Sequence, residues 1–423
     1  MRTMNWRERW KAIGPGIITG AADNDPAGIV TYAQTGAAFG LGLGWLAAWC
    51  VPLMVAVQEA SARVGQVSGQ GFMAVIRRRA PRSVIALLLF GLVAANVFNI
   101  GADLAAMVDA FALVVPSVPP GPALLGTAVI IAVLIVLVPY RSYARILRWA
   151  TFSLLAYVAS AVLVVPSWRE ILHTAFIPSW PGGGEPWLMA TAFLGTTLSP
   201  YLFVWQSNEE VEEEIDRGRD TVERRRGATQ SEIAGMRFGA ASGMAASQAV
   251  AFCILATAAI ALRAAGAEGI ASGADAARLL EPVAGRWASA LFALGILGTG
   301  ALAVPVLAAS SAYALADVLR WPMGLGKTFS QAREFYLVIV GGVVAGLGFN
   351  VLGIPPYKAL IWSAVLNGIV AGPFAIAVMV AANDRKSMGR HRSGFWSNLG
   401  VSCAAIALFA VPLVALADHV GIL

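Results

Sequence analysis

Apolar stretches of about 20 residues, the length needed to cross the hydrocarbon core of a bilayer, recur along the whole chain between short polar segments. We predict eleven spans, centred near Ala22, Val55, Ala95, Ile131, Ala156, Thr196, Ala251, Pro305, Gly342, Gly368 and Leu408. The short alternating strands typical of a membrane β-barrel are absent from this pattern. The sequence therefore predicts an all-α polytopic membrane protein with one transmembrane domain over residues 1–423.

Composition supports this prediction. The chain is 58% hydrophobic and 13% charged, whereas a soluble domain has about 25% charged residues. Cys50, Cys253 and Cys403 lie in apolar segments, so neither a disulfide framework nor a cysteine zinc site is expected. The basic first residues run into the first span without a small-residue cleavage site, which indicates a retained start rather than a removable signal peptide.

The polar loops alternate in charge. One set contains the N-terminus and residues 63–82, 140–148, 216–226, 319–333 and 384–392; the other contains residues 116–122, 168–176, 263–286 and 350–356. About 25 of the 30 Lys and Arg residues lie in the first set, which the positive-inside rule assigns to the cytoplasm. We therefore expect a cytoplasmic N-terminus and, with an odd number of spans, a C-terminus outside.

The same loop bias accounts for the net charge of +6, so no nucleic-acid partner is expected. The expected surroundings are a lipid bilayer, most simply a bacterial inner membrane. No obligate protein partner is implied.

The first span is interrupted by a polar stretch at its middle. Pro26 removes a backbone donor, and Gly28 makes irregular dihedrals easier. A break at this depth frees carbonyl groups, which is tolerated only where the break faces protein or a water-filled cavity. The carboxylate of Asp25 is costly there and indicates a functional site.

The sixth span has a matching interruption between Gly195 and Pro200. Interrupted segments at corresponding positions of two halves are typical of an inverted-repeat transporter. We expect residues 12–168 to form the first repeat, residues 186–383 the second, and residues 396–420 an eleventh helix. The alternative is that both prolines only kink their helices.

At these residues the chain resembles the Nramp (natural resistance-associated macrophage protein) family of divalent-metal transporters. The likeness runs through GPGIITGAADNDPAGIVTYAQTGAAFG, ADLAAMVDAFAL and GTTLSPYLFVWQ. It implies a LeuT-type fold of 5+5 inverted repeats, with helices 1 and 6 broken. The family's Asp-Pro-Gly-Asn motif reads DPAG at 25–28, its Met-Pro-His motif reads SPY at 199–201, and its Asp-Leu-Ala-Glu run reads DLAA at 103–106.

These differences from the family motifs affect the prediction of which ion is transported. The ion is the substrate, and no cofactor is expected. A thioether favours transition metals, and Ser199 replaces it with a small hydroxyl. Gly28 in place of Asn is expected to widen the cavity for Mg²⁺, a hard ion that keeps several waters. The chain thus looks like the Nramp-related magnesium transporters.

Proton acceptors of the family are also replaced, by Ala106 and Tyr201. This points to uncoupled Mg²⁺ uptake driven by the membrane potential, about 4.6 kcal/mol per divalent ion at 100 mV.

Asp25 is the first candidate metal ligand. Pro200 is expected to free the carbonyls of Thr196 and Thr197, one of which would face the ion. The other candidates are Asn24, Gly28, Ser199, Tyr201 and Asn367. The Asn367 amide would contact the ion or make an interhelical hydrogen bond.

The sequence leaves more than one role open for two further acidic residues, Asp23 and Asp103. Asp23, like Asn24, caps the C-terminal end of the first half-helix, faces a water-filled vestibule or contacts the ion. Asp103 either lines an inner pathway or pairs with an arginine.

Charged residues outside the breaks are interpreted as structural. Glu59 and Arg63 have the i, i+4 spacing of a helical ion pair. The run after the sixth span predicts a solvated helix with ion pairs. The alternative is that its acidic residues attract cations near the inner mouth; these are Glu209, Glu210, Glu212, Glu213 and Glu214.

Three other functions are alternatives to Mg²⁺ transport. A proton-coupled Mn²⁺ or Fe²⁺ transporter remains open, because Mn²⁺ also accepts oxygen ligands. A membrane-embedded enzyme would need a nucleophile with a base, or an H-E-x-x-H spacing, and the sequence has neither. A channel with a fixed pore is disfavoured by the paired breaks.

Overall fold

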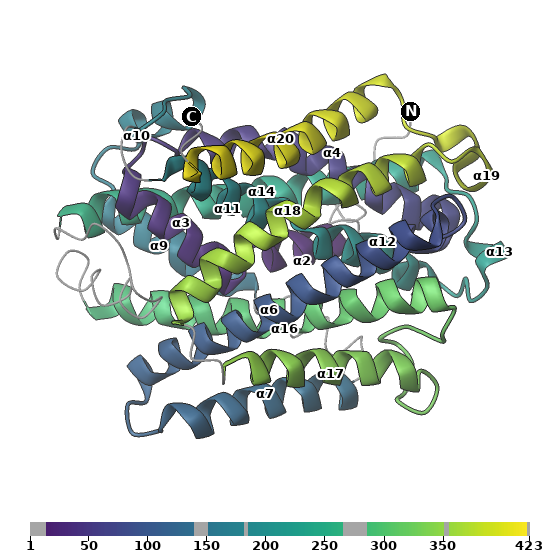
Figure 1. Ribbon diagram of the computed structural model, residues 1–423, viewed down its shortest axis with the longest axis horizontal. Helices are drawn as coiled ribbons and strands as arrows, with labels where there is room; N and C mark the ends of the chain where they lie inside the picture. The colour runs from purple at the N-terminus through teal and green to yellow at the C-terminus, as the bar shows by residue number, and fades with distance from the viewer. Residues whose placement is uncertain (1–13, 139–150, 182–184, 265–285, 351–354, 421–423) are drawn as a thin grey trace.

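The computed structural model describes residues 14–138, 151–181, 185–264, 286–350 and 355–420, and every regular element in these ranges is helical (Figure 1). The first half contains α2 (Gly14–Ala22), α3 (Pro26–Phe39), α4 (Trp45–Ser68), α5 (Phe72–Ile76), α6 (Arg82–Val114), α7 (Pro120–Leu137), η1 (Thr151–Leu154), α9 (Leu155–Val164) and α10 (Trp168–Phe176). The second half contains α11 (Pro186–Thr197), α12 (Pro200–Asp216), α13 (Val222–Arg225), α14 (Gln230–Ala264), α16 (Arg286–Leu319), α17 (Arg333–Phe349), α18 (Pro356–Ala382), α19 (Arg385–Met388), η3 (Gly389–His391) and α20 (Phe395–His419). The all-α prediction is confirmed.

Within the described ranges, eight helical segments are long and apolar enough to cross a membrane. They include α11 and α12, counted together as one interrupted segment over Pro186–Asp216. The other three predicted centres fall on helices that are shorter, namely α2, α9 and α17. Two basic regions of the sequence, the N-terminus and residues 140–148, lie outside the described residues.

The interrupted helices lie inside the bundle. In Figure 1, α18 crosses in front of them, and it packs against α6, α11 and α20. Behind, α14 packs against α2, α3 and α4, while α16 packs against α6 and α17. Of the most apolar window of the α11–α12 segment, 89% is buried, against 17% for α7. The breaks are therefore shielded from lipid by the surrounding helices.

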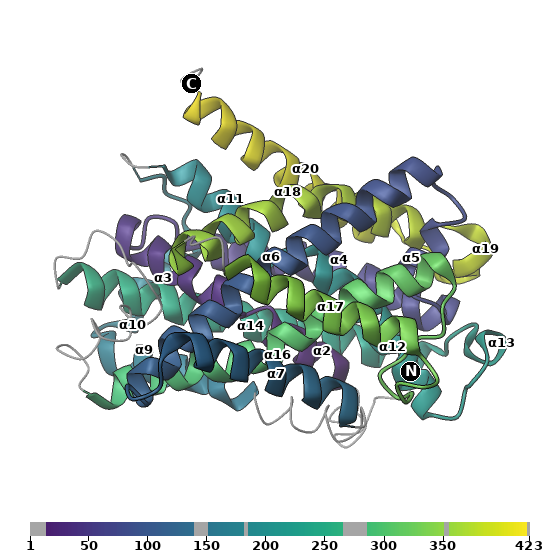
Figure 2. The same ribbon diagram turned by 60° about the horizontal axis from the view of Figure 1, so that its bottom comes forward.

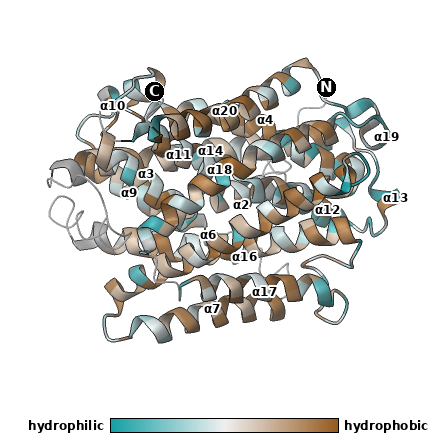
Figure 3. Cartoon of the chain, viewed as in Figure 1, coloured by the Kyte–Doolittle hydropathy of each residue, from teal (hydrophilic) through white to brown (hydrophobic). Residues whose placement is uncertain are grey.

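The outer helices present apolar side chains outwards. On α7 the exposed residues include Leu125, Val129 and Ile130. Apolar residues cover much of the bundle in Figure 3, and hydrophilic ones gather near α13 and α19. Figure 2 shows the C-terminal end of α20 standing away from the other helices. This distribution is what a bilayer requires of a helical protein.

Glycines bring the first interrupted span against α14. A Cβ built on Gly16 would lie 2.2 Å from the carbonyl oxygen of Gly239, and one on Gly20 would lie 2.3 Å from that of Gly243. Small residues allow membrane helices to approach backbone to backbone. We call this contact the glycine seam; it fixes where α2 ends relative to α14.

Loops that the sequence places in the basic set contact one another. Arg79 forms an ion pair with Asp384, and the Arg225 Nε donates to the Gly69 carbonyl at 3.1 Å. On the side of α10, Trp45 Nε1 donates to the Ser179 carbonyl at 2.8 Å. The side of the membrane on which each set lies stays a prediction.

The ion pair expected between Glu59 and Arg63 is confirmed, with 2.9 Å between Arg63 Nε and Glu59 Oε1. Arg237 joins it, with 2.8 Å between its Nε and the same oxygen. Arg63 also donates to the carbonyl of His391 at 2.7 Å. The Glu59–Arg63 pair therefore ties α4 to α14 through Arg237 and to the segment before α20 through the His391 carbonyl.

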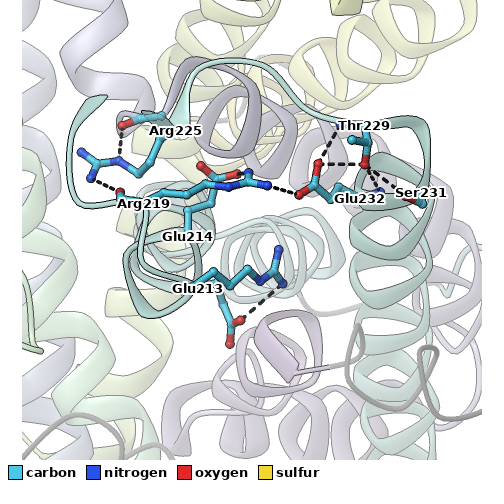
Figure 4. A network of polar contacts seen from close by, with 9 residues as sticks. Glu213, Glu214, Arg219, Arg225, Thr229, Ser231 and Glu232 are labelled. Atoms are coloured by element: carbon cyan, nitrogen blue, oxygen red, sulfur yellow. Dashed lines mark hydrogen bonds and ion pairs between the residues drawn. The ribbon is translucent and has the colours of Figure 1, made fainter. Parts of the chain in front are cut away.

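The acidic run on α12 differs from its prediction. Ion pairs are present: Arg219 contacts Glu214 at 3.0 Å and Glu232 at 2.6 Å, as Figure 4 shows. The prediction of a solvated helix is wrong, however, because α12 packs against α4 and α16. Four of its five predicted acidic residues are buried: Glu209, Glu210, Glu212 and Glu214.

The ion pair of Asp384 predicts a pH-dependent stability. Burial acts to raise the pKa of Asp384, but hydrogen bonds from Ser387 and the charge of Arg79 outweigh it and lower the pKa. A carboxyl whose pKa is lower in the folded state than in the unfolded state stabilises the fold at pH values above the unfolded pKa of about 3.9. This stabilisation is lost as the pH falls through the folded pKa. We expect Asp384→Asn to lower the free energy of unfolding at pH 7, and with it the thermal midpoint. The loss should be about 1 kcal/mol or less, because Arg79 is 39% exposed.

The measurement is the thermal midpoint of both proteins between pH 7 and pH 3. The difference between them should shrink as pH falls. An equal difference at both ends of the range would contradict the assignment.

Candidate metal site

The first break is built around Asp25. Helix α2 ends at Ala22 and α3 begins at Pro26, so Asp25 is the N-cap of α3. Its Oδ1 accepts a hydrogen bond from the Gly28 backbone N–H at 2.6 Å. An Asp N-cap followed by proline is a favourable helix start, so this local sequence both interrupts the span and orients the carboxylate.

The second break lies between Thr197 and Pro200, where α11 ends and α12 begins. The Ser199 hydroxyl is within hydrogen-bonding distance of the carbonyls of Gly195, at 2.7 Å, and Thr196, at 2.9 Å. The expectation of a free Thr196 carbonyl is therefore wrong in this conformation. The Ser199 hydroxyl reaches the Thr196 carbonyl, one turn earlier in the chain, and replaces the backbone N–H donor that Pro200 lacks.

The two breaks meet at Asp25. The Thr196 hydroxyl lies 3.5 Å from Asp25 Oδ1, and the Tyr201 hydroxyl lies 3.4 Å from Oδ2. Tyr201 also donates to the carbonyl of Ala22 at 2.9 Å, at the end of α2. Tyr201 therefore joins both breaks. The hydroxyl of the remaining candidate, Thr197, lies 3.3 Å from that of Tyr32.

The wider cavity expected at Gly28 is not present, because other atoms occupy the space beside this glycine. A Cβ at this position would lie 2.8 Å from the Thr196 hydroxyl and 3.2 Å from Asp25 Oδ1. The prediction of a cavity widened by this glycine is therefore wrong in this conformation, because the start of α3 abuts the end of α11. Gly28 instead permits the close approach of the two breaks.

Asn99 contacts Asp25 and is not among the predicted site residues. Its Nδ2 donates to Asp25 Oδ2 at 2.8 Å from α6, and its Oδ1 has no hydrogen-bond partner among the described residues. One turn later on α6, Asp103 Oδ1 accepts from the Ala27 backbone N–H at 3.1 Å. The signal was present, because Asn99 and Asp103 are polar residues at i, i+4 in an apolar span and so share one helix face.

Of the two predicted roles of Asp103, pairing with an arginine is not seen among the described residues, and lining an inner pathway stays a prediction. Asp103 contacts the first break, and none of the ion pairs in the described part of the chain includes it. It is fully buried.

Two of the predicted ligands, Asn24 and Asn367, have no hydrogen bond to Asp25 among the described residues. The Asn24 Nδ2 donates to the Ser247 hydroxyl at 2.8 Å, so Asn24 faces α14. Asn367 is buried on α18, and its Oδ1 has no hydrogen-bond partner within the described ranges. It adjoins Gly368, whose backbone N would lie 2.5 Å from a Cβ on Gly195. Asn367 therefore adjoins a close backbone contact between α18 and α11.

The carboxyl groups at and near the first break are buried away from solvent. Asp23, Asp25 and Asp103 are at most 1% exposed, and a buried carboxylate without a counter-charge is costly. Within the described ranges, no three His, Cys, Asp or Glu side chains form a metal-binding group. A cation at Asp25 would therefore be completed by neutral oxygens of hydroxyls, amides, carbonyls or water, which suit hard ions.

Two broken helices that meet at a buried carboxylate, inside an all-helical membrane bundle, are the arrangement expected of a transporter of the inverted-repeat class. The fold is similar to that of the Eremococcus coleocola manganese transporter in complex with an aromatic bis-isothiourea substituted compound. The TM-score is 0.75 at 17% identity, over 98% of this chain and 87% of that chain. A mutant of the same transporter gives 0.73 at 17% identity, over 100% and 90%.

A third similar structure is Mhp1, a nucleobase-cation-symport-1 family transporter in a closed conformation. Its TM-score is 0.62 at 14% identity, over 96% of this chain and 93% of that chain. Residues 16–418 match the family described as Natural resistance-associated macrophage protein-like, and the chain belongs to this family. It is a multi-pass membrane metal transporter with a LeuT-type fold, which confirms the predicted fold class and family.

Proposed function

We propose that this transporter carries Mg²⁺ into the cytoplasm by alternating access, without proton coupling, and that Mn²⁺ is a weaker substrate. The observation that carries the proposal is the set of groups around Asp25. They are the Thr196 and Tyr201 hydroxyls and the Asn99 amide, so the contacts of this carboxylate contain no sulfur. Oxygen ligands with retained waters suit Mg²⁺, whereas a soft ligand would favour transition metals.

In the proposed site Asp25 supplies the negative charge and binds the ion directly or through water. Thr196 and Tyr201 add hydroxyl oxygens, and Asn99 offers the amide oxygen that has no hydrogen-bond partner among the described residues. Of the remaining candidates, we expect Gly28, Thr197, Ser199 and Asn367 to reach the ion as the helices move, whereas Asn24 faces α14.

Uncoupled transport is supported by the surroundings of Tyr201 and Ala106. The Tyr201 hydroxyl donates to a backbone carbonyl, so it serves a structural hydrogen bond rather than offering a free base. Ala106 is a buried methyl group on α6, where the family's motif has a carboxylate. With the N-terminus in the cytoplasm and the C-terminus outside a bacterial inner membrane, the potential would drive entry.

A second candidate is proton-coupled Mn²⁺ or Fe²⁺ transport. It is favoured by the position of Asp103, a buried carboxylate that touches the break and could carry a proton. A similar fold belongs to a transporter described as a manganese transporter.

The deciding experiment is metal influx into liposomes with an internal pH dye, comparing Mg²⁺ with Mn²⁺. We expect Mg²⁺ entry without acidification. We also expect Ser199→Met to shift the ratio of rates towards Mn²⁺ by about tenfold, because it restores a soft ligand. Ser199→Ala is the matched control, since it removes the hydroxyl without adding sulfur. Entry of Mn²⁺ with acidification and no entry of Mg²⁺ would overturn the proposal.

A second test concerns Asn99, which holds Asp25 from outside the two breaks. Groups that orient a metal ligand typically contribute 10–100-fold in metal affinity. We expect Asn99→Ala to weaken binding of Mg²⁺ by about this factor in calorimetric titrations of the purified protein.

Asn96→Ala is the matched control for that variant. Asn96 is a buried asparagine on the same helix, but it donates to the carbonyl of Leu307 on α16, at 3.1 Å. Its loss should lower thermal stability without changing the affinity. Equal effects of both variants on affinity would mean that Asn99 acts only through packing.

A further inference from the structure

A second polar cluster lies between the end of α2 and the middle of α14. The Ser247 hydroxyl donates to Asp23 Oδ2 and accepts from Asn24 Nδ2 at 2.8 Å. The next residue on α14, Gln248, places its Nε2 3.5 Å from the same Asp23 oxygen. Two side chains of the first break and two of α14 are thus joined through one hydroxyl and one carboxylate oxygen.

Three oxygen atoms of this cluster have no hydrogen-bond partner among the described residues. They are Asp23 Oδ1, Asn24 Oδ1 and Gln248 Oε1. The residues that carry them are at most 2% exposed. An unsatisfied buried acceptor costs about 1–3 kcal/mol, so a bound cation or a water is expected at these three oxygens, which have no donor among the described residues.

The electrostatics of the position also favour a cation. Helix α2 ends at Ala22, and the C-terminal end of a helix carries partial negative charge. None of the ion pairs among the described residues includes Asp23. A divalent ion at Asp25 would balance two charges, whereas Asp23, Asp25 and Asp103 together carry three when ionised.

We propose that Asp23, Asn24 and Gln248 bind an alkali-metal cation at a site separate from that of Asp25. One carboxylate with neutral amide oxygens gives a site of single negative charge and hard ligands, which matches a monovalent ion. A proton on Asp23 would give a donor to only one of the two amide oxygens. A water would give donors to two acceptors but would leave the charge uncompensated.

The location gives this cation a structural consequence. The cluster lies beside the glycine seam, one turn after the contact of Gly20 with Gly243. A bound cation joins the end of α2 to α14 and thereby holds the segment that carries Asp25. The proposal stands whichever divalent ion is transported.

The test is binding of ²²Na⁺ to the purified full-length protein in lipid nanodiscs, without divalent ions and with choline chloride keeping the ionic strength constant. We expect saturable binding that excess unlabelled NaCl or KCl displaces. The more effective competitor identifies the ion that the site prefers. Asp23→Asn and Gln248→Leu should each weaken binding at least about tenfold.

Two further comparisons separate this site from its surroundings. Ser247→Ala should weaken ²²Na⁺ binding, whereas Ser242→Ala should not, because the Ser242 hydroxyl donates within α14 to the carbonyl of Gly239. Asp25→Asn should retain ²²Na⁺ binding even where it abolishes metal transport. Failure of the Mg²⁺ proposal would therefore leave this result unchanged.

The absence of saturable binding to the wild type would overturn the proposal and leave a buried water as the occupant. Binding that is lost in Asp25→Asn and kept in Asp23→Asn would also overturn it. Because Asp23→Asn alters a buried charge, Gln248→Leu provides an independent variant, and the thermal midpoint of each shows whether it is folded.

Discussion

Asp25→Asn is expected to fold and to transport metal at least about 100-fold more slowly than the wild type. Asn is as good an N-cap as Asp, so the variant keeps the acceptor for the Gly28 N–H, which lies 2.6 Å from the carboxylate. What it loses is the charge. Interactions with a charged group contribute about 1.5–3 kcal/mol, and 2.7 kcal/mol corresponds to about 100-fold. The measurement is the initial rate of metal influx into liposomes.

Asp418→Asn is the matched control for this variant. Asp418 lies near the end of α20, away from both breaks, so the same chemical change there should leave the rate of influx unaltered. A rate for Asp25→Asn above half of the wild-type value, at equal reconstitution, would remove Asp25 from the site.

Gly195→Ala should have the largest effect on stability. A Cβ at this position would lie 1.9 Å from the Ala364 carbonyl oxygen and 2.5 Å from the backbone N of Gly368. Both obstacles are backbone atoms, so α18 would have to move away from α11. Overpacking typically costs 1–3 kcal/mol, and we expect about 3 kcal/mol or more here, measured as a fall in the thermal midpoint of the purified protein.

The control is Gly341→Ala on α17, where an added Cβ would meet nothing within 4 Å. Alanine in a helix interior is about 0.5–1 kcal/mol more favourable than glycine, so this variant should be unchanged or slightly stabilised. Similar losses in both variants would show that helix propensity, rather than the contact between α11 and α18, governs the result.

The breaks could be predicted from sequence because their causes are local. Pro26 and Pro200 each lack the backbone N–H that would continue the helix, polar residues precede them, and both breaks occur where expected. The partners of the break residues could not be predicted in the same way. The distance of Asn99 from Asp25 depends on how α6 packs, and the donor for the Thr196 carbonyl depends on the rotamer of Ser199.

The acidic run on α12 shows the same limit. Its composition is typical of a solvated helix, and its ion pairs with arginine are present. Its burial follows from α4 and α16, which are distant in sequence. Local charge predicted the chemistry of these side chains, but only the packing of distant helices determines whether water reaches them.

The glycine seam has a mechanical consequence. With 2.2 Å between a Cβ on Gly16 and the Gly239 carbonyl oxygen, no layer of side chains separates α2 from α14 on which the two helices could slide. We therefore expect them to travel as one rigid body when the transporter changes state. The hinge for this motion then falls at the residues between α2 and α3, so the segment that holds the ion is also the joint that opens the path to it.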